Sequence, residues 1–247
     1  MRSGTLDLNA DLGEGVGDDA AMLSVVTSAN IACGGHAGDA DTMAATCAVA
    51  LTHGVRIGAH PAYPDRENFG RAPVVISEAV LTNELRTQVR ALIEEASAVG
   101  AQVTYLKPHG ALYHAATRDP EHARAVVTTA AEAGLAVVGP PGSLLLDLAG
   151  RAGLGAVPEA FADRAYTSDG GLVPREQPGA VLHDPIVIAE RVMQLLRTGT
   201  MIADDGTSVS LDIRTLCVHG DTPGAVAIAT HVRAALDRAG LSPVSFT

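Results

Sequence analysis

The chain has 247 residues, enough for one large α/β barrel or two small domains. No Ser/Pro-rich linker or break in composition divides it, so we expect a single domain spanning residues 1–247. The net charge of −11 excludes nucleic acid as a partner, because binding to phosphates requires clustered positive charge.

Short apolar runs rich in β-branched residues indicate strands, and they alternate with longer runs of helical period. Aromatic residues make up only 3% of the chain, so the core that these strands form must consist of Ala, Val, Leu and Ile. The predicted strands are residues 4–9, 27–33, 55–59, 102–106, 135–139, 154–158, 180–182 and 213–218.

Amphipathic helices separate the predicted strands. The clearest spans residues 77–99, where apolar residues from Leu81 to Val99 recur every three or four positions, with Ser77 and Gly100 as its caps. A second helix runs from Asp39 to His53. Three others are expected to begin where a capping residue precedes proline, at Asp119-Pro120, Asp184-Pro185 and Thr222-Pro223. Residues 201–210 resemble a hairpin insertion.

Strands that alternate with helices and are buried on both faces form a parallel sheet. A closed barrel and a doubly wound open sheet both satisfy this pattern, and periodicity does not separate them.

Membrane and secretory features are absent from the sequence. It contains neither an 18-residue apolar span nor the apolar core of a signal peptide, so we expect no membrane association. The three cysteines, Cys33, Cys47 and Cys217, are odd in number and form no CxxC pair. These features together favour a reduced, cytoplasmic setting.

Six dense polar clusters follow predicted strands, at the end where α/β folds build active sites. Solvated loops would favour Lys, Ser and Asn over the Gly-His pairs found here. We therefore interpret the clusters as one site. They are residues 9–14 (NADLGE), 30–39 (NIACGGHAGD), 58–61 (GAHP), 107–110 (KPHG), 159–164 (EAFADR) and 218–221 (VHGD).

Lys107 is the only lysine among 17 basic residues. It directly follows a predicted strand and precedes Pro108 and His109. Because burial can lower the pKa of an ammonium but not of a guanidinium, this position favours a functional role. We expect Lys107→Arg to leave stability nearly unchanged and to lower turnover at least about tenfold.

Four histidines lie at strand ends beside Gly or Pro, namely His36, His60, His109 and His219. Histidine with aspartate binds divalent metals or performs acid–base chemistry near neutral pH. Asp11, His36 and His60, with Glu14 nearby, form a hypothetical metal site with open coordination positions. The remaining histidines are interpreted as structural or solvated: His53, His114, His122, His183 and His231.

Other functional signals are weak. The Gly13-x-Gly15-x-Gly17 run resembles a dinucleotide loop, but Glu14 places negative charge where a pyrophosphate would lie. No phosphate loop of the GxxxxGK[ST] type and no GxSxG motif occur. Cys33 is more plausible as a buried structural thiol than as a nucleophile.

The same clusters resemble the LamB/YcsF family from about residue 5 to residue 240. The matching runs are NADLGE, TSANIACGGHAGD, GVRIGAHPAYPD with NFGR, LKPHGALYH, EAFADRAY, DGGLVPR and CVHGDTPGAV. The resemblance implies an irregular seven-stranded (β/α) barrel, TIM-like and of the glycoside hydrolase/deacetylase type. It also implies ATP-dependent opening of 5-oxo-L-proline to L-glutamate, together with 5-oxoprolinase subunits B and C on other chains.

Three positions depart from the family pattern. Gly35 stands where an aromatic residue is usual, Ala62 where glycine is usual, and Ala72 where a second arginine often follows FGR. The loss of the aromatic residue and of the second arginine is expected to alter the pocket wall or one substrate contact.

The implied reaction assigns roles to the clustered residues. A lactam is unreactive towards water, so its opening needs a base, a cation for the oxyanion and an acid for the ring nitrogen. Asp11 or Glu14 is the candidate base, Lys107 or a metal the cation, and His60 or His109 the acid. Arg164 is a candidate clamp for the substrate carboxylate. The other candidate substrate-binding residues are Asn9, Glu159, His219 and Asp221.

The missing phosphate loop indicates that ATP binds largely on a partner subunit, or on this chain through a motif that the sequence does not reveal. Two alternatives remain open at the level of sequence. One is a metal-dependent, deacetylase-like amide hydrolase that acts without ATP. The other is a non-catalytic subunit that binds the lactam, although capture of an anion would favour Arg and backbone N–H groups over the acidic residues found here.

Overall fold

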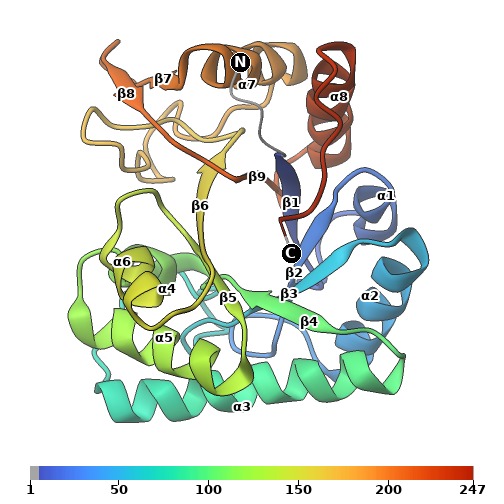
Figure 1. The fold of residues 1–247 in the computed structure, drawn as a ribbon, viewed down its shortest axis with the longest axis vertical. Coiled ribbons are helices and arrows are strands. Elements are labelled where there is room, and N and C mark those ends of the chain that lie inside the picture. The colour runs from blue at the N-terminus through green and yellow to red at the C-terminus, as the bar shows by residue number, and fades with distance from the viewer. Residues whose placement is uncertain (1–5, 247) are drawn as a thin grey trace.

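Seven parallel strands close into a ring in the computed structural model, which describes residues 6–246 (Figure 1). Their order is β1-β2-β3-β4-β5-β6-β9, and β9 pairs with β1. The strands are β1 (Asp7–Leu12), β2 (Ser28–Ala32), β3 (Arg56–His60), β4 (Val103–Leu106), β5 (Ala136–Gly139), β6 (Ala156–Phe161) and β9 (Thr215–His219). The barrel is therefore the correct architecture of the two, and the implied seven-stranded fold is confirmed.

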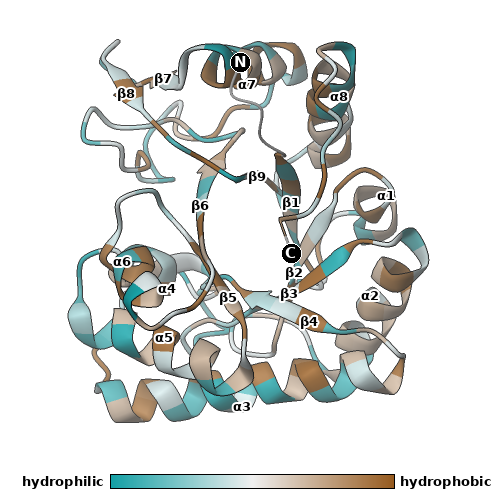
Figure 2. Ribbon diagram, in the orientation of Figure 1, coloured by the Kyte–Doolittle hydropathy of each residue, from teal (hydrophilic) through white to brown (hydrophobic). Residues whose placement is uncertain are grey.

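Helices surround the barrel. They are α1 (Asp19–Leu23), α2 (Ala40–His53), α3 (Glu78–Ala98), α4 (Gly110–Ala115), α5 (Pro120–Ala133), α6 (Leu144–Arg151), α7 (Pro185–Thr198) and α8 (Ala225–Arg238). Figure 2 shows brown and teal bands on α3, and the predicted stripe from Leu81 to Ala96 is buried. The helices α1, α4 and α6 are too short to reveal a period in the sequence. No helix of residues 6–246 has the length and apolar character that crossing a membrane requires.

Two of the three expected Pro-containing helix starts are confirmed. The carboxylates of Asp119 and Asp184 accept hydrogen bonds from backbone N–H groups in the first turns of α5 and α7. The third expectation is wrong, because α8 begins at Ala225 with Gly224 as its N-cap. Thr222 instead donates its hydroxyl to the buried carboxylate of Asp163 (3.0 Å), which needs donors in place of water.

The predicted strand at residues 180–182 is not a barrel strand. Val181 forms only an isolated bridge with Arg164, so this apolar run pairs with an earlier part of the same β6–α7 connection. The hairpin expected at residues 201–210 is confirmed by β7 (Thr200–Ile202) and β8 (Ser208–Ser210).

Several strands extend further towards their carboxyl ends than apolar patterning indicated. The first was predicted at residues 4–9, of which 4 and 5 lie outside the described residues, whereas β1 reaches Leu12. Similarly, β6 continues to Phe161. Asn9, Asp11 and Glu159 therefore belong to strands, although polar residues normally indicate loops.

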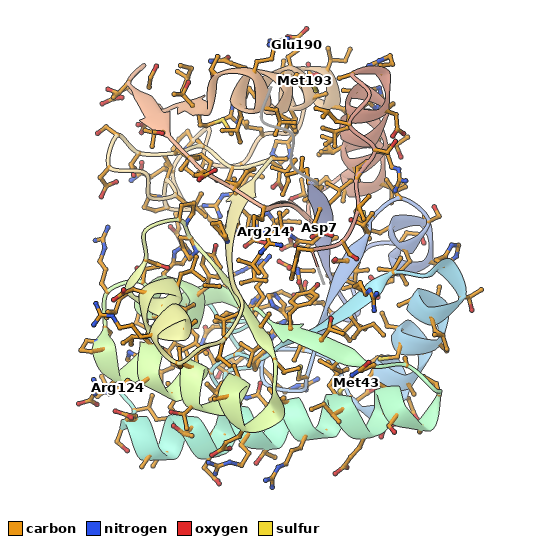
Figure 3. All side chains as sticks on the ribbon, viewed as in Figure 1. Asp7, Met43, Arg124, Glu190, Met193 and Arg214 are labelled. Atoms are coloured by element: carbon orange, nitrogen blue, oxygen red, sulfur yellow. The ribbon has the colours of Figure 1, made fainter. Side chains whose placement is uncertain are left out.

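These polar residues form a network within the barrel. The Asn9 amide donates to Glu159 Oε1 (2.9 Å), and the Asn30 amide donates to Asn9 Oδ1 (2.7 Å) and to Asp11 Oδ1 (2.8 Å). Figure 3 shows side chains filling the middle of the ring, whereas Arg124 lies on an outer helix. Because the network joins side chains of different strands, it fixes polar atoms at defined positions below the barrel mouth.

Candidate functional site

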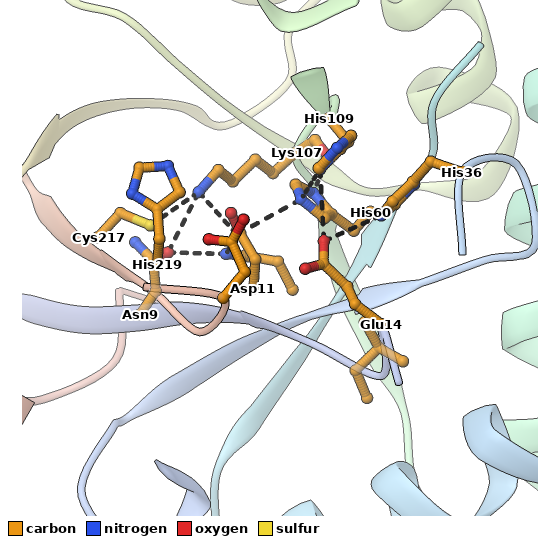
Figure 4. Close-up of polar contacts among 12 residues, drawn as sticks. Asn9, Asp11, Glu14, His36, His60, Lys107, His109, Cys217 and His219 are labelled. Atoms are coloured by element: carbon orange, nitrogen blue, oxygen red, sulfur yellow. Dashed lines mark hydrogen bonds and ion pairs between the residues drawn. The ribbon is translucent and has the colours of Figure 1, made fainter. Parts of the chain in front are cut away.

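The polar clusters identified in the sequence meet at the mouth of the barrel formed by the carboxyl ends of the strands. Asp11 of β1 is in register with His219 of β9, His60 ends β3, and Lys107 directly follows β4. Figure 4 shows these side chains pointing toward one another, together with those of Glu14, His36 and His109.

Lys107 is held in a cage of polar atoms and is only 1% exposed. Its Nζ lies 3.0 Å from Asp11 Oδ1, 3.0 Å from Glu159 Oε1, 3.1 Å from Cys217 Sγ and 3.4 Å from Asn9 Oδ1. Burial opposes the charge, but Asp11, Cys217 and Glu159 raise the pKa of Lys107 well above its usual value. Lys107 is therefore a fixed cation.

Glu14, His36, His60 and His109 form a second, adjoining cluster. One potential ligand atom from each lies within 4.8 Å of the others, and all four residues are buried. His36 Nε2 is 3.0 Å from Glu14 Oε1, and the ring of His36 stacks on that of His109 with centroids 3.6 Å apart. The four residues come from β3 and from the segments that follow β1, β2 and β4.

Hydrogen bonds to backbone carbonyls fix the orientation of two of these histidines. His60 Nδ1 lies 2.8 Å from the carbonyl oxygen of Lys107, and His109 Nε2 lies 3.0 Å from that of Phe69. Each of these nitrogens must carry the proton, since a carbonyl only accepts. The remaining nitrogens, His60 Nε2 and His109 Nδ1, then direct lone pairs at each other across 2.9 Å.

Two facing lone pairs repel each other unless a proton or a metal ion lies between them, and the donor set fits a divalent metal. Backbone carbonyls that hold the outer nitrogens of imidazole ligands are a common feature of metal sites. Burial lowers the pKa of His36 to about 2 and lowers that of His109 well below its usual value, which keeps both rings in the neutral, ligating form. Burial and then Asp11 raise the pKa of Glu14, and a cation bound beside this carboxyl would lower that pKa.

The cluster differs from the ligand set expected from the sequence. Asp11 lies 3.4 Å from His60 Nε2 but also 3.0 Å from Lys107 Nζ. Burial opposes the Asp11 charge, whereas Lys107 and then His60 lower the pKa of Asp11 well below its usual range. His36 and His60 lie in the cluster, and Glu14 and His109 complete it in place of Asp11.

The backbone of Phe69 is strained beside this cluster. Its φ of 55° is in the left-handed region, which costs a non-glycine residue on the order of 1–3 kcal/mol. The carbonyl of Phe69 is the acceptor that orients His109. The strain therefore coincides with the positioning of a candidate ligand.

His219 forms a separate acid–base pair with Asp163. His219 Nδ1 lies 2.9 Å from Asp163 Oδ1, and the imidazole stacks on Phe161 with centroids 4.9 Å apart. Burial would raise the pKa of Asp163, but His219 and the Thr222 hydroxyl lower it. The carboxylate thus holds the proton on Nδ1 and leaves Nε2 of His219 as an acceptor.

A cavity of about 850 Å³ opens above these groups, lined by Asp11, His60, Lys107, His109 and His219 among others. Arg164 is a buried part of its wall and donates from Nε to the Ala180 carbonyl (3.2 Å) and from Nη2 to the Val173 carbonyl (2.6 Å). Asp221 forms ion pairs with Arg71 and Arg175, which also line the cavity.

Sequence reasoning missed several lining residues. His114 and His122 were interpreted as structural or solvated, yet both lie on the cavity wall with Tyr113. Arg71, His114 and Arg175 occur within the runs NFGR, LKPHGALYH and DGGLVPR, so the family resemblance already contained a signal for them. Burial raises the pKa of Cys33 to about 12, which fits the structural thiol expected.

Gly35, one of the departures from the family pattern, makes room for Gln88. The Gln88 amide accepts from the Ala62 N–H (3.0 Å) and donates to the Ala62 carbonyl (2.8 Å). A Cβ at position 35 would overlap the Gln88 amide. Two of the unusual residues therefore contact the same side chain behind the histidine cluster.

Comparison with known proteins places these features in a family. Residues 6–247 match the LamB/YcsF family model. The 5-oxoprolinase A subunit of Kocuria rhizophila is 50% identical, with 98% of each chain covered. The lactam utilization protein of Thermus thermophilus is 38% identical, with a TM-score of 0.92 over 98% of this chain and 100% of that one. The polysaccharide deacetylase Bc1974 of Bacillus cereus shares the fold at 12% identity and TM-score 0.51, covering 98% and 93%.

Proposed function

Because the chain belongs to the LamB/YcsF family, we propose that it is the lactam-opening subunit of a 5-oxoprolinase. The reaction would convert 5-oxo-L-proline to L-glutamate, with ATP hydrolysed to ADP and phosphate by the whole complex. The names of its relatives, the 5-oxoprolinase A subunit and the lactam utilization protein, support this substrate. The three free, buried cysteines suit the cytoplasmic setting that the proposal includes.

The observation that carries the proposal is that the Lys107 cage and the histidine–glutamate cluster adjoin each other beside one cavity. The caged Lys107 ammonium adjoins the cluster of Glu14, His36, His60 and His109, and Asp11 lies between them. A divalent ion held by that cluster would supply a Lewis acid and an activated water. Amide hydrolysis uses both functions, whereas simple capture of an anion needs neither.

The chain's own residues account for the remaining requirements. Lys107, a fixed cation beside the cavity, stabilises negative charge that develops on the lactam carbonyl oxygen. His219, which Asp163 orients, uses its Nε2 to exchange a proton with the nitrogen of the lactam ring. Asp11 serves as the counter-charge that fixes Lys107, since a carboxylate with a lowered pKa is a weak base.

ATP is assigned to partner proteins in this proposal. The relatives are named as one lettered part of 5-oxoprolinase, which supports a complex, and subunits B and C are the expected partners. Phosphorylation of the carbonyl oxygen would turn it into a good leaving group, and the site described here would then complete hydrolysis.

The second candidate function is a metal-dependent amide hydrolase that needs no ATP. The buried histidine–glutamate cluster favours this function, because a metal ion bound to such a donor set would activate water without prior phosphorylation of the substrate.

Glutamate formation from 5-oxoproline distinguishes these functions. We expect turnover with the chain, subunits B and C, and ATP, and its loss when His36→Ala replaces wild type; the exposed His231→Ala is the matched control. Turnover by the metal-loaded chain alone without ATP would favour the second candidate. Full turnover by subunits B and C without this chain would contradict the proposal.

A further inference from the structure

Four arginines line the cavity above the metal-ligand cluster of Glu14, His36, His60 and His109. Arg118 is exposed and pairs with Asp169, and the other three are considered together. Arg71 follows β3, whereas Arg164 and Arg175 belong to the β6–α7 connection. Arg71 and Arg175 both reach Asp221 Oδ2, the latter at 3.5 Å, and the Arg71 guanidinium also lies over the Phe69 ring at 4.9 Å. Two separate segments therefore bring permanent positive charges to one wall.

These charges exceed the acidic groups beside them. Among residues 6–246, Asp221 is the only carboxylate within 4.0 Å of the three guanidinium groups, so three positive charges face one negative charge. Arg164 donates to two carbonyl oxygens, and the nearby Asp163 carboxylate is already bound by His219 and Thr222. The part of the wall formed by these three arginines is therefore positive in a protein of net charge −11.

Two of the arginines remain accessible. The side chains of Arg71 and Arg175 are 40% and 26% exposed, so an anion in the cavity reaches them without displacing a buried group. A cavity of about 850 Å³ lies near the upper end of the range for drug-sized ligands. A five-membered lactam fills only part of it, which leaves room for another anionic group beside the arginines.

We propose that Arg71 and Arg175, with Arg164 behind them, bind a phosphate group. Guanidinium forks match phosphate oxygens in pairs, and two or three such charges suit a dianion better than a single carboxylate. The inference rests on the proposed function, in which the lactam is phosphorylated before hydrolysis. The phosphate would belong either to a nucleotide or to the phosphorylated lactam delivered by a partner protein.

Calorimetric titration of the full chain with inorganic phosphate tests the site, with a chelator present so that no metal contributes. We expect Arg175→Gln to weaken phosphate binding at least about tenfold, as loss of a charged hydrogen-bond partner does. Arg86→Gln is the matched control, because Arg86 pairs with Glu132 away from the cavity and should bind phosphate like wild type. Arg175 suits the test since its only ion pair among residues 6–246 is the one to Asp221, whereas Arg164 also holds the connection in place.

The variant Asp221→Asn should change the affinity for phosphate in the opposite direction. Removing the carboxylate that the two arginines share should tighten phosphate binding about two- to fivefold. A purely structural role of the Arg–Asp cluster would instead make Asp221→Asn and Arg175→Gln change binding in the same direction, which would overturn the proposal.

Titrations with ATP and with 5-oxoproline identify the source of the anion. ATP binding that is tighter than phosphate binding and sensitive to Arg175→Gln assigns the phosphate to a nucleotide. If phosphate binds but ATP binds no more tightly than phosphate, the bound phosphate group is assigned to the phosphorylated lactam. The inference is overturned if the wild-type chain does not bind phosphate. It is also overturned if Arg175→Gln weakens the binding of 5-oxoproline but not the binding of phosphate. Because glutamate formation is measured separately, that result leaves the proposed function standing.

Discussion

The burial of Lys107 changes what its replacement should do. The sequence indicated that Lys107→Arg would preserve stability, but Nζ has four polar neighbours within 3.4 Å, which leave little space for a planar guanidinium. We now expect a loss of about 1–3 kcal/mol from overpacking, together with the loss of at least about tenfold in turnover.

Thermal unfolding and turnover of the assembled complex check both parts, with Arg86→Lys as a surface control. A variant with the wild-type melting temperature and wild-type kinetics would show that Lys107 is neither tightly packed nor functional.

Asp163 should make the stability depend on pH at the acidic end. Its pKa is lowered in the folded state by His219 and Thr222 despite burial, so the folded state binds the proton less readily than the unfolded chain. Its stabilisation is then present above about pH 3.8 and is lost as the pH falls through the folded pKa. Asp163→Asn should cost about 1.5–3 kcal/mol at pH 7, and this difference should shrink below pH 4.

Urea unfolding of wild type and Asp163→Asn between pH 7 and pH 3 measures this difference. A gap that stays constant over the whole range would show that the carboxylate contributes through packing rather than through its charge.

At the scale of elements, the register between β3 and β4 depends on Gly58. The pairing shifts between Ile57 and Gly58, and a Cβ on Gly58 would overlap the ring of Tyr105 on β4. The absent side chain thus lets a fully buried tyrosine fit inside the barrel. Gly58→Ala should destabilise the fold by about 1–3 kcal/mol through overpacking.

A double-mutant cycle with Tyr105→Leu isolates this contact in denaturant unfolding. Gly58→Ala should cost clearly less in the Tyr105→Leu background. Equal costs in both backgrounds would assign the effect to the glycine backbone instead.

At the scale of the whole molecule, the candidate metal ligands connect four consecutive strands. Glu14 follows β1, His36 follows β2, His60 ends β3 and His109 follows β4. An ion bound to all four residues would therefore stabilise the folded barrel and not the unfolded chain. A divalent transition metal at about a hundred times its dissociation constant adds roughly 2.7 kcal/mol, which corresponds to about 5–10 °C in melting temperature.

Melting curves of chelator-treated protein with and without zinc or manganese measure this shift. His109→Gln should abolish it, and His231→Gln, on the exposed side of α8, should keep it. An equal shift in both variants would place the ion elsewhere.

The sequence alone determined the alternation of strands and helices, the starts of α2, α3, α5 and α7, and the motifs that build the site. The apolar residues from Leu81 to Ala96 recur with helical spacing, and Asp119 and Asp184 cap the first turns of α5 and α7. Both signals depend on residues only a few positions apart in the chain. Such local rules also located the polar clusters at strand ends, since chain order is enough to show which segment follows which strand.

Only the tertiary structure decided which of these polar residues contact one another. Asp11 and Glu159 lie beyond the predicted strand ends and look like loop residues until the barrel closes and turns them inward, towards Lys107. Glu14 and His109, far apart in sequence, face each other at 3.5 Å only because β1 and β4 lie on the same barrel. The choice between barrel and open sheet and the composition of the metal-ligand cluster both depend on contacts across the barrel, and a periodic pattern along one strand carries no information about its distance from another.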